Sequence, residues 1–134
     1  TNLGAAPSGT GSTGSVVGYT PHYAPMEQIR GIGTNPRSDV YALSATLYQL
    51  LTNMVPADAL SRADSMLTGN PDPIRPIHEI NPEVPPAISE VILKGMEVGQ
   101  DKRFESARDM QKALRKAFAS MQTAMSAETV AFTL

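Results

Sequence analysis

Few residues in this 134-residue chain could act as nucleophiles or metal ligands. Cysteine is absent, which excludes a disulfide scaffold and thiolate chemistry and allows a reducing compartment. The two histidines, His22 and His78, lie far apart and lack acidic neighbours at ligand spacing. We therefore expect no metal site built by this chain. The chemistry left open is that of hydroxyl, carboxylate and guanidinium groups.

Hydroxyl groups are concentrated in residues 1–17, a segment rich in Gly, Ser and Thr. A segment with so little apolar surface cannot offset the entropy lost on ordering, so we expect it to be flexible. It is either a linker or a regulatory loop whose hydroxyls accept phosphate. The candidate phosphorylation sites are Thr10, Ser12, Thr13 and Ser15.

The element that must position any site is the apolar stretch 38–52. Between Val40 and Leu51 only Ser44, Thr46 and Gln49 are polar, and large apolar residues recur at helical spacing. A helix that is apolar almost all round is normally buried, and about 15 residues are too few to span a bilayer. We predict a central buried helix, with Ser38 as its N-cap and Asn53 as its left-handed terminator.

Three further helices are predicted. One spans 55–68, with Asp58 as a cap and Leu60, Ala63 and Leu67 facing inward; the others span 86–97 and about 106–121. Proline-rich loops join them, and residues 69–86 alone hold six prolines. No strand or internal repeat is evident. The fold class is therefore mainly α, with about four main helices around the central helix 38–52.

Charge gives little support for nucleic-acid binding. The net charge is −2, and although 102–116 holds six of the eleven Lys and Arg residues, carboxylates interrupt the run and no aromatic platform accompanies it. No signal peptide or membrane span is visible. The length fits one domain or part of one.

Three fragments, in this order, resemble the eukaryotic-like serine/threonine protein kinases of bacteria. They are Thr20-Pro21-His22-Tyr23-Ala24-Pro25-Met26-Glu27-Gln28, Ser38-Asp39-Val40-Tyr41-Ala42-Leu43-Ser44 and Asp101-Lys102-Arg103-Phe104. In the family, the first closes the activation loop, the second opens the buried helix of the large lobe, and the third precedes its last helix. Here Pro25 stands one place early and Ser44 replaces a usual glycine.

The resemblance implies roles for several residues. Glu27 and Arg103, 76 positions apart, match a largely buried ion pair that ties the activation segment to the base of the lobe. Asp39 matches the carboxylate that anchors the catalytic loop, although an acid in a first helical turn is also favoured by the helix dipole alone. Thr20, Pro21 and Tyr23 match the substrate-binding loop, and Thr20 could equally be an ordinary turn hydroxyl.

Two motifs that carry phosphoryl transfer in this family, His-Arg-Asp and Asp-Phe-Gly, do not occur in the sequence. The resemblance thus implies a partial kinase large lobe at 18–121, after a segment of activation loop at 1–17 and before a tail or juxtamembrane linker at 122–134. We expect no catalytic residue, metal or cofactor in this piece, and Mg-ATP in the parent kinase.

The expected partners are the N-terminal part of the kinase domain, protein substrates of the parent, and further copies that associate through exposed core. The expected location is the cytoplasm, with any membrane anchor in a later segment. The alternative is a non-catalytic, pseudokinase-like helical scaffold or protein-binding module.

Overall fold

The structure, a computed structural model, describes residues 21–133, and helices connected by loops make up this part of the chain. No strand occurs within 21–133, and the mainly α class is confirmed. The elements are η2 (Pro21–Tyr23), α2 (Met26–Ile29), α3 (Pro36–Thr52), α4 (Ala59–Leu67), α5 (Ile77–Ile80), α6 (Pro86–Gly95), η3 (Gln100–Lys102) and α7 (Ala107–Thr133). Four of them, α3, α4, α6 and α7, are longer than two turns.

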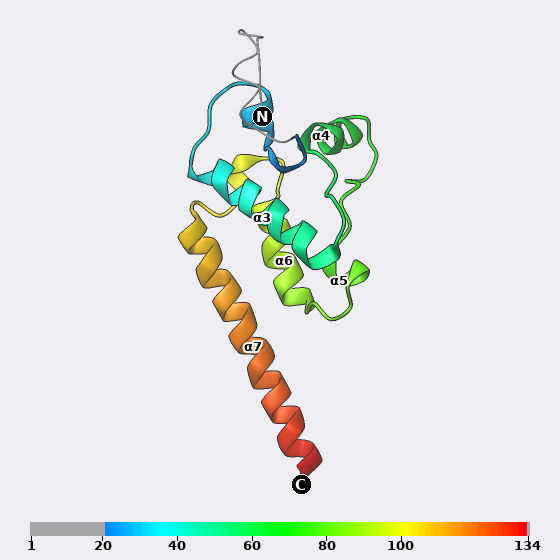
Figure 1. Cartoon of the computed structure of the whole chain (residues 1–134), viewed down its shortest axis with the longest axis vertical. Coiled ribbons are helices and arrows are strands. Elements are labelled where there is room, and N and C mark those ends of the chain that lie inside the picture. The colour runs from blue at the N-terminus through cyan, green and yellow to red at the C-terminus, as the bar shows by residue number, and fades with distance from the viewer. Residues whose placement is uncertain (1–20, 134) are drawn as a thin grey trace.

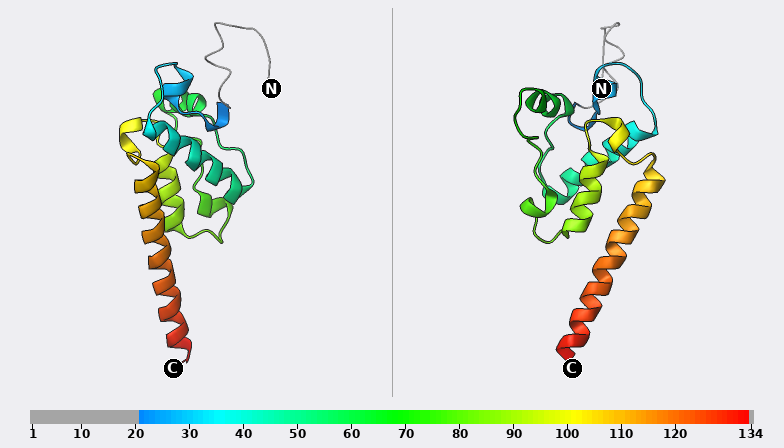
Figure 2. Two further views of the ribbon diagram at one scale, coloured as in Figure 1. Left: turned by 60° about the vertical axis from the view of Figure 1, so that its left-hand side comes forward. Right: turned by 180° about the vertical axis from the view of Figure 1, so that it is seen from behind.

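Helix α3 occupies the middle of the fold (Figure 1). It packs against α5, α6 and α7 and against the short η2, while α2 lies next to α4. Figure 2 shows from two further sides that α7 runs along α6 and then continues well past the other helices. The fold is therefore a small helical body with one long helix extending from it.

The start of α3 lies two residues before the predicted boundary. Asn35 is the N-cap: its side chain accepts hydrogen bonds from the backbone N–H groups of Arg37 and Ser38, at 2.8 and 3.3 Å. Ser38 is the third helical residue, and its hydroxyl accepts a bond from the Asn35 N–H. The prediction of Ser38 as N-cap was wrong because Pro36, which favours the first helical position, starts the helix earlier. Asn53 ends α3 with φ of 56°, as expected.

The core is built on one side of α3. Val40, Tyr41, Ala45 and Tyr48 are buried there. The residues that meet them from other elements include Ile77, Ile92, Met96 and Met110. Each large aliphatic side chain buried in this way contributes roughly 1.5–3 kcal/mol. This cluster holds α5, α6 and α7 to α3.

The other side of α3 is open. Leu43 is 41% exposed and Leu50 73% exposed, and Asp39 is exposed on the same side. These residues lie four and seven positions apart, so they share one face of the helix. Within residues 21–133, α7 borders this face at Leu43 and η2 borders it at Leu50, but neither covers it. Part of the apolar surface of α3 therefore remains exposed.

Helices α3 and α6 approach closely where Ser44 faces Gly95. A Cβ atom placed on Gly95 would clash with the Ser44 hydroxyl and lie 3.3 Å from a methyl group of Val40. The Ser44 hydroxyl donates to the sulfur of Met110 at 3.3 Å, so it also reaches α7. The missing side chain at Gly95 thus makes room for the hydroxyl at Ser44.

Helix α4 presents a different face from the predicted one. Asp58 caps it through the Ser61 N–H, as expected, but Leu60 and Leu67 are exposed. The buried residues are Ala59 and Arg62. Arg62 can face inward because its charge is paired with Asp72.

Helix α7 continues to Thr133, through most of the 122–134 segment predicted as a tail. None of the helices within 21–133 combines the length and apolar character required to cross a bilayer.

Candidate functional site

The strongest cluster of polar side chains is centred on Glu27 and Arg103. One guanidinium nitrogen of Arg103 lies 2.7 Å from Glu27 Oε2 and the other 3.0 Å from Oε1, which makes the contact bidentate. The Arg103 side chain is fully buried and that of Glu27 nearly so. Charge-assisted pairs with two parallel bonds are the strongest hydrogen bonds that side chains form. The two residues come from α2 and from the loop before α7, 76 positions apart.

The remaining donors of Arg103 are also satisfied. Its Nε donates to the carbonyl of Glu97 at 2.7 Å, and its terminal nitrogens donate to the carbonyls of Arg37 and Val98 at 3.1 Å. The guanidinium carbon stacks 5.0 Å from the centre of the Tyr41 ring. A buried guanidinium with a full set of partners fixes the start of α3 and the end of α6 in one place.

Glu27 has a second partner in Ser38, whose hydroxyl donates to Oε2 at 2.7 Å. Burial alone raises the pKa of the Glu27 carboxyl, but the hydrogen bonds from Arg103 and Ser38 outweigh it, so the pKa is lowered overall. Glu27 is therefore a carboxylate that stays ionised and acts as an acceptor. This arrangement suits a structural anchor rather than a proton-transferring acid or base.

The three sequence fragments that carry the family resemblance meet at this carboxylate. Glu27 belongs to the first fragment, Ser38 to the second and Arg103 to the third. The loop fragment is thereby joined both to the N-terminal turn of α3 and to the segment that leads into α7.

The residues predicted to form the substrate-binding loop, Pro21 and Tyr23, lie beside α3, on the side of Leu50. Pro21 and Tyr23 form the single turn η2, and Tyr23 borders a hollow of about 340 Å³ whose other lining residues belong to α3 and its end: Thr46, Gln49, Leu50 and Asn53. The ring Nδ1 of His22 lies 3.1 Å from the Pro56 carbonyl, which ties the turn to the segment after α3. Thr20 lies outside the described residues, as do the candidate phosphorylation sites Thr10, Ser12, Thr13 and Ser15.

Asp39 stands in the first turn of α3 and is exposed, one position past the Ser38 that contacts Glu27. Its carboxylate and the open face at Leu43 and Leu50 belong to the same side of the helix. The body therefore presents an acceptor group next to bare apolar surface, an arrangement suited to receiving another polypeptide segment.

A second buried arginine was missed in the sequence. Arg62 of α4 makes a bidentate contact with Asp72, at 3.0 and 2.8 Å, and donates to the Met96 carbonyl at 2.6 Å and to the Tyr41 hydroxyl at 3.2 Å. Hydrogen bonds and the nearby guanidinium lower the pKa of Asp72 despite its burial. The only sequence signal for the burial of Arg62 was its position three residues after Ala59 in a short helix. No feature of the nearby sequence identified Asp72 as its partner.

Among residues 21–133 no three His, Cys, Asp or Glu side chains gather in a way that could hold a metal ion. The described site is built around one buried ion pair, Glu27–Arg103.

The relatives of this chain are bacterial protein kinases. It is 35% identical over 113 residues to the serine/threonine-protein kinase PksC of Streptomyces coelicolor, which is 84% of this chain and 20% of that protein. It is 35% identical over 106 residues to the serine/threonine-protein kinase PrkC of Bacillus subtilis, which is 79% of this chain and 16% of that one. The chain thus spans a fifth or less of these relatives. No family model matches it.

Solved kinase structures share the fold. A structure of PpkA in its apo form superposes with a TM-score of 0.63 at 23% identity, over 77% of this chain and 34% of that one. The kinase domain of PknI from Mycobacterium tuberculosis gives 0.57 at 20% identity, over 84% of this chain and 38% of that domain. At such identities the likeness establishes the fold.

Proposed function

We propose that the parent of this chain transfers the γ-phosphate of Mg-ATP to protein Ser and Thr hydroxyls. The chain itself corresponds to the C-terminal part of the large lobe of a bacterial serine/threonine-protein kinase domain. In that parent, this piece carries the substrate-binding loop and the helical core of the lobe. Other segments of the parent supply the residues that bind the phosphates and the metal ions, and the catalytic loop.

One observation supports this assignment above the others: the three kinase-like fragments converge on the buried Glu27–Arg103 pair. In a helical scaffold unrelated to kinases, we would not expect this particular pair to join a Thr-Pro-x-Tyr loop to a central helix. In the proposed role the pair ties the end of the activation segment to the base of the lobe. Pro21 and Tyr23 then belong to the loop that meets the substrate protein, together with Thr20.

We assign Asp39 and the open face of α3 to the upstream part of the kinase domain. The carboxylate accepts backbone N–H groups of the catalytic loop, and Leu43 and Leu50 receive apolar side chains beneath it. Where that upstream part is absent, the same face is one candidate surface for association between copies of this chain. Use of ATP places this part of the parent in the cytoplasm.

The piece is inactive by itself in this proposal. The purified 134-residue chain should show no Mg-ATP turnover and no phosphate transfer to a protein substrate, since the sequence holds neither His-Arg-Asp nor Asp-Phe-Gly. Turnover by the purified chain would overturn the assignment of its roles.

The parent activity is tested with a chimera in which residues 21–121 replace the matching segment of the kinase domain of Bacillus subtilis PrkC. Transfer of labelled phosphate from ATP by the chimera, and its loss in Asp39→Asn with circular dichroism unchanged, are the expected results. Glu105→Gln serves as the control because Glu105 is exposed and pairs only with Arg37 at 3.7 Å. A chimera that folds but transfers no phosphate would favour the alternative, a non-catalytic scaffold.

A further inference from the structure

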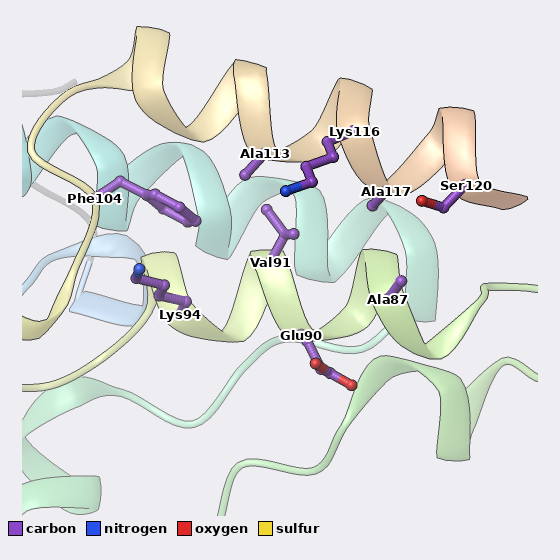
Figure 3. Close-up of a pocket in the computed structure, with 9 residues that line it drawn as sticks. All are labelled: Ala87, Glu90, Val91, Lys94, Phe104, Ala113, Lys116, Ala117 and Ser120. Atoms are coloured by element: carbon purple, nitrogen blue, oxygen red, sulfur yellow. The ribbon is translucent and has the colours of Figure 1, made fainter.

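A groove runs between α6 and α7, on the side of α7 away from the open face of α3 (Figure 3). It has a volume of about 470 Å³. One face of each helix lines it, together with the loop before α7: Ala87, Glu90, Val91, Lys94, Phe104, Ala113, Lys116, Ala117 and Ser120. The α7 wall is mostly small, with Ala113, Ala117 and Ser120, and it faces the short side chains of Ala87 and Val91 on α6. The two helices therefore leave space between them that their own side chains do not fill.

The groove has an apolar floor and cationic edges. The Lys94 ammonium lies 4.5 Å from the centre of the Phe104 ring at one end. Figure 3 shows Lys116 directed toward the groove beside Val91, whereas Glu90 points away from α7. An occupant with small apolar side chains and a carboxylate therefore complements this surface.

The walls favour a helix as the occupant. Both are α-helices whose backbone groups bond internally, so an extended segment would bury N–H and C=O groups with no partner on this surface. An α-helix satisfies its own backbone and lays one face into such a groove. The lining runs over eight residues on each helix, 87–94 and 113–120, which is roughly 10 Å or about two helical turns.

The same chain contains a segment with this chemistry. Residues 122–133 form the last part of α7, which extends past α6 and the rest of the body (Figures 1 and 2). The segment holds no Lys or Arg, and its single charged residue is Glu128. A helix so poor in charge gains stability from a partner, since isolated helices of this length are marginal in water. It cannot occupy its own groove, because α7 itself forms one wall.

We propose that this segment, residues 122–133, lies antiparallel in the α6–α7 groove of a second copy of the chain, and that the exchange is mutual. Two-fold symmetry makes both contacts identical and closes the assembly as a dimer. Centring the segment on the groove residues 113–120 sets the register. In that register position 128 of one copy, the one charged position of the segment, lies level with Lys116 of the other.

The experiment is sedimentation equilibrium of the full chain over a wide concentration range, with circular dichroism to verify folding. We expect a monomer–dimer equilibrium. Lys116→Glu and Glu128→Lys should each raise the dimer dissociation constant roughly tenfold, since each charge reversal acts twice in a symmetric dimer. The double variant should restore the wild-type dissociation constant. Arg115→Glu is the matched control, because Arg115 is exposed on α7 and does not line the groove.

The competing assembly, through the open face of α3, is distinguished by Leu50→Ser. Association that survives Leu50→Ser and follows the charge exchange between positions 116 and 128 supports the proposal. Two results would overturn the proposal. One is association that Leu50→Ser abolishes and the charge variants leave unaffected; the other is a wild-type chain that remains monomeric at its highest soluble concentration. The kinase assignment is tested separately, by phosphate transfer from ATP in the chimera.

Discussion

The carboxylate of Glu27 accepts two hydrogen bonds from the guanidinium of Arg103, at 2.7 and 3.0 Å, in the interior of the molecule. These residues are 76 positions apart, so the contact forms only when α2, α3 and the segment before α7 have assembled. Because Ser38 and three backbone carbonyls complete the cluster, loss of either charge leaves the other buried without its main partner.

Glu27→Gln should lower the free energy of unfolding by about 3–5 kcal/mol, because it strands the buried Arg103 charge. Urea denaturation followed by circular dichroism measures the change. Glu105→Gln, which removes an exposed partner of Arg37, should change it by less than about 0.5 kcal/mol. Equal effects of the two variants would mean that the buried pair contributes no more than a solvated one.

Stability should fall in acid. The folded state lowers the pKa of Glu27 and of Asp72, in each case because bonds to an arginine outweigh the effect of burial. The resulting stabilisation is complete above the unfolded-state pKa values of about 3.9–4.3 and is lost as the pH falls through the lower folded-state values. Unfolding measured from pH 7 to pH 3 tests this. Asp72→Asn should flatten part of the dependence, and an unchanged profile would exclude Asp72 as a contributor.

Gly95→Ala should destabilise the fold by about 1–3 kcal/mol through overpacking against Ser44, although alanine is the better helix former. Ser44→Gly combined with Gly95→Ala removes the clash. A double-mutant cycle should therefore give a favourable coupling of about 0.5–3 kcal/mol between the two substitutions. Additive effects would show that α3 and α6 separate to accommodate the methyl group.

Ile92→Ala should cost about 2–5 kcal/mol, because Ile92 is buried between α6 and α3. Leu50→Ala, on the open face of α3, should change stability by less than about 0.5 kcal/mol. Thermal and urea unfolding of the two variants give the comparison. A large cost at Leu50 would mean that something covers this face in solution.

Local patterns were enough to predict much of the fold. The apolar period placed α3, the prolines placed the loops, and Asn53 and Asp58 fixed helix ends, because each of these effects acts within a few residues. The order of the three kinase-like fragments indicated the fold class, which the relatives and the structural neighbours confirm.

The tertiary structure decided what depends on contacts between distant segments. An apolar residue in a sequence indicates a tendency to be buried, but it does not identify the surface that would bury it. For this reason the exposure of Leu50 and Leu67 and the α6–α7 groove could not be predicted. Arg62 could not be distinguished from a surface arginine until Asp72 was brought to it from the next loop. The sequence determined the helices and the likeness to a kinase lobe, whereas only packing determined which faces are covered, since burial is a property of pairs of surfaces and not of one residue.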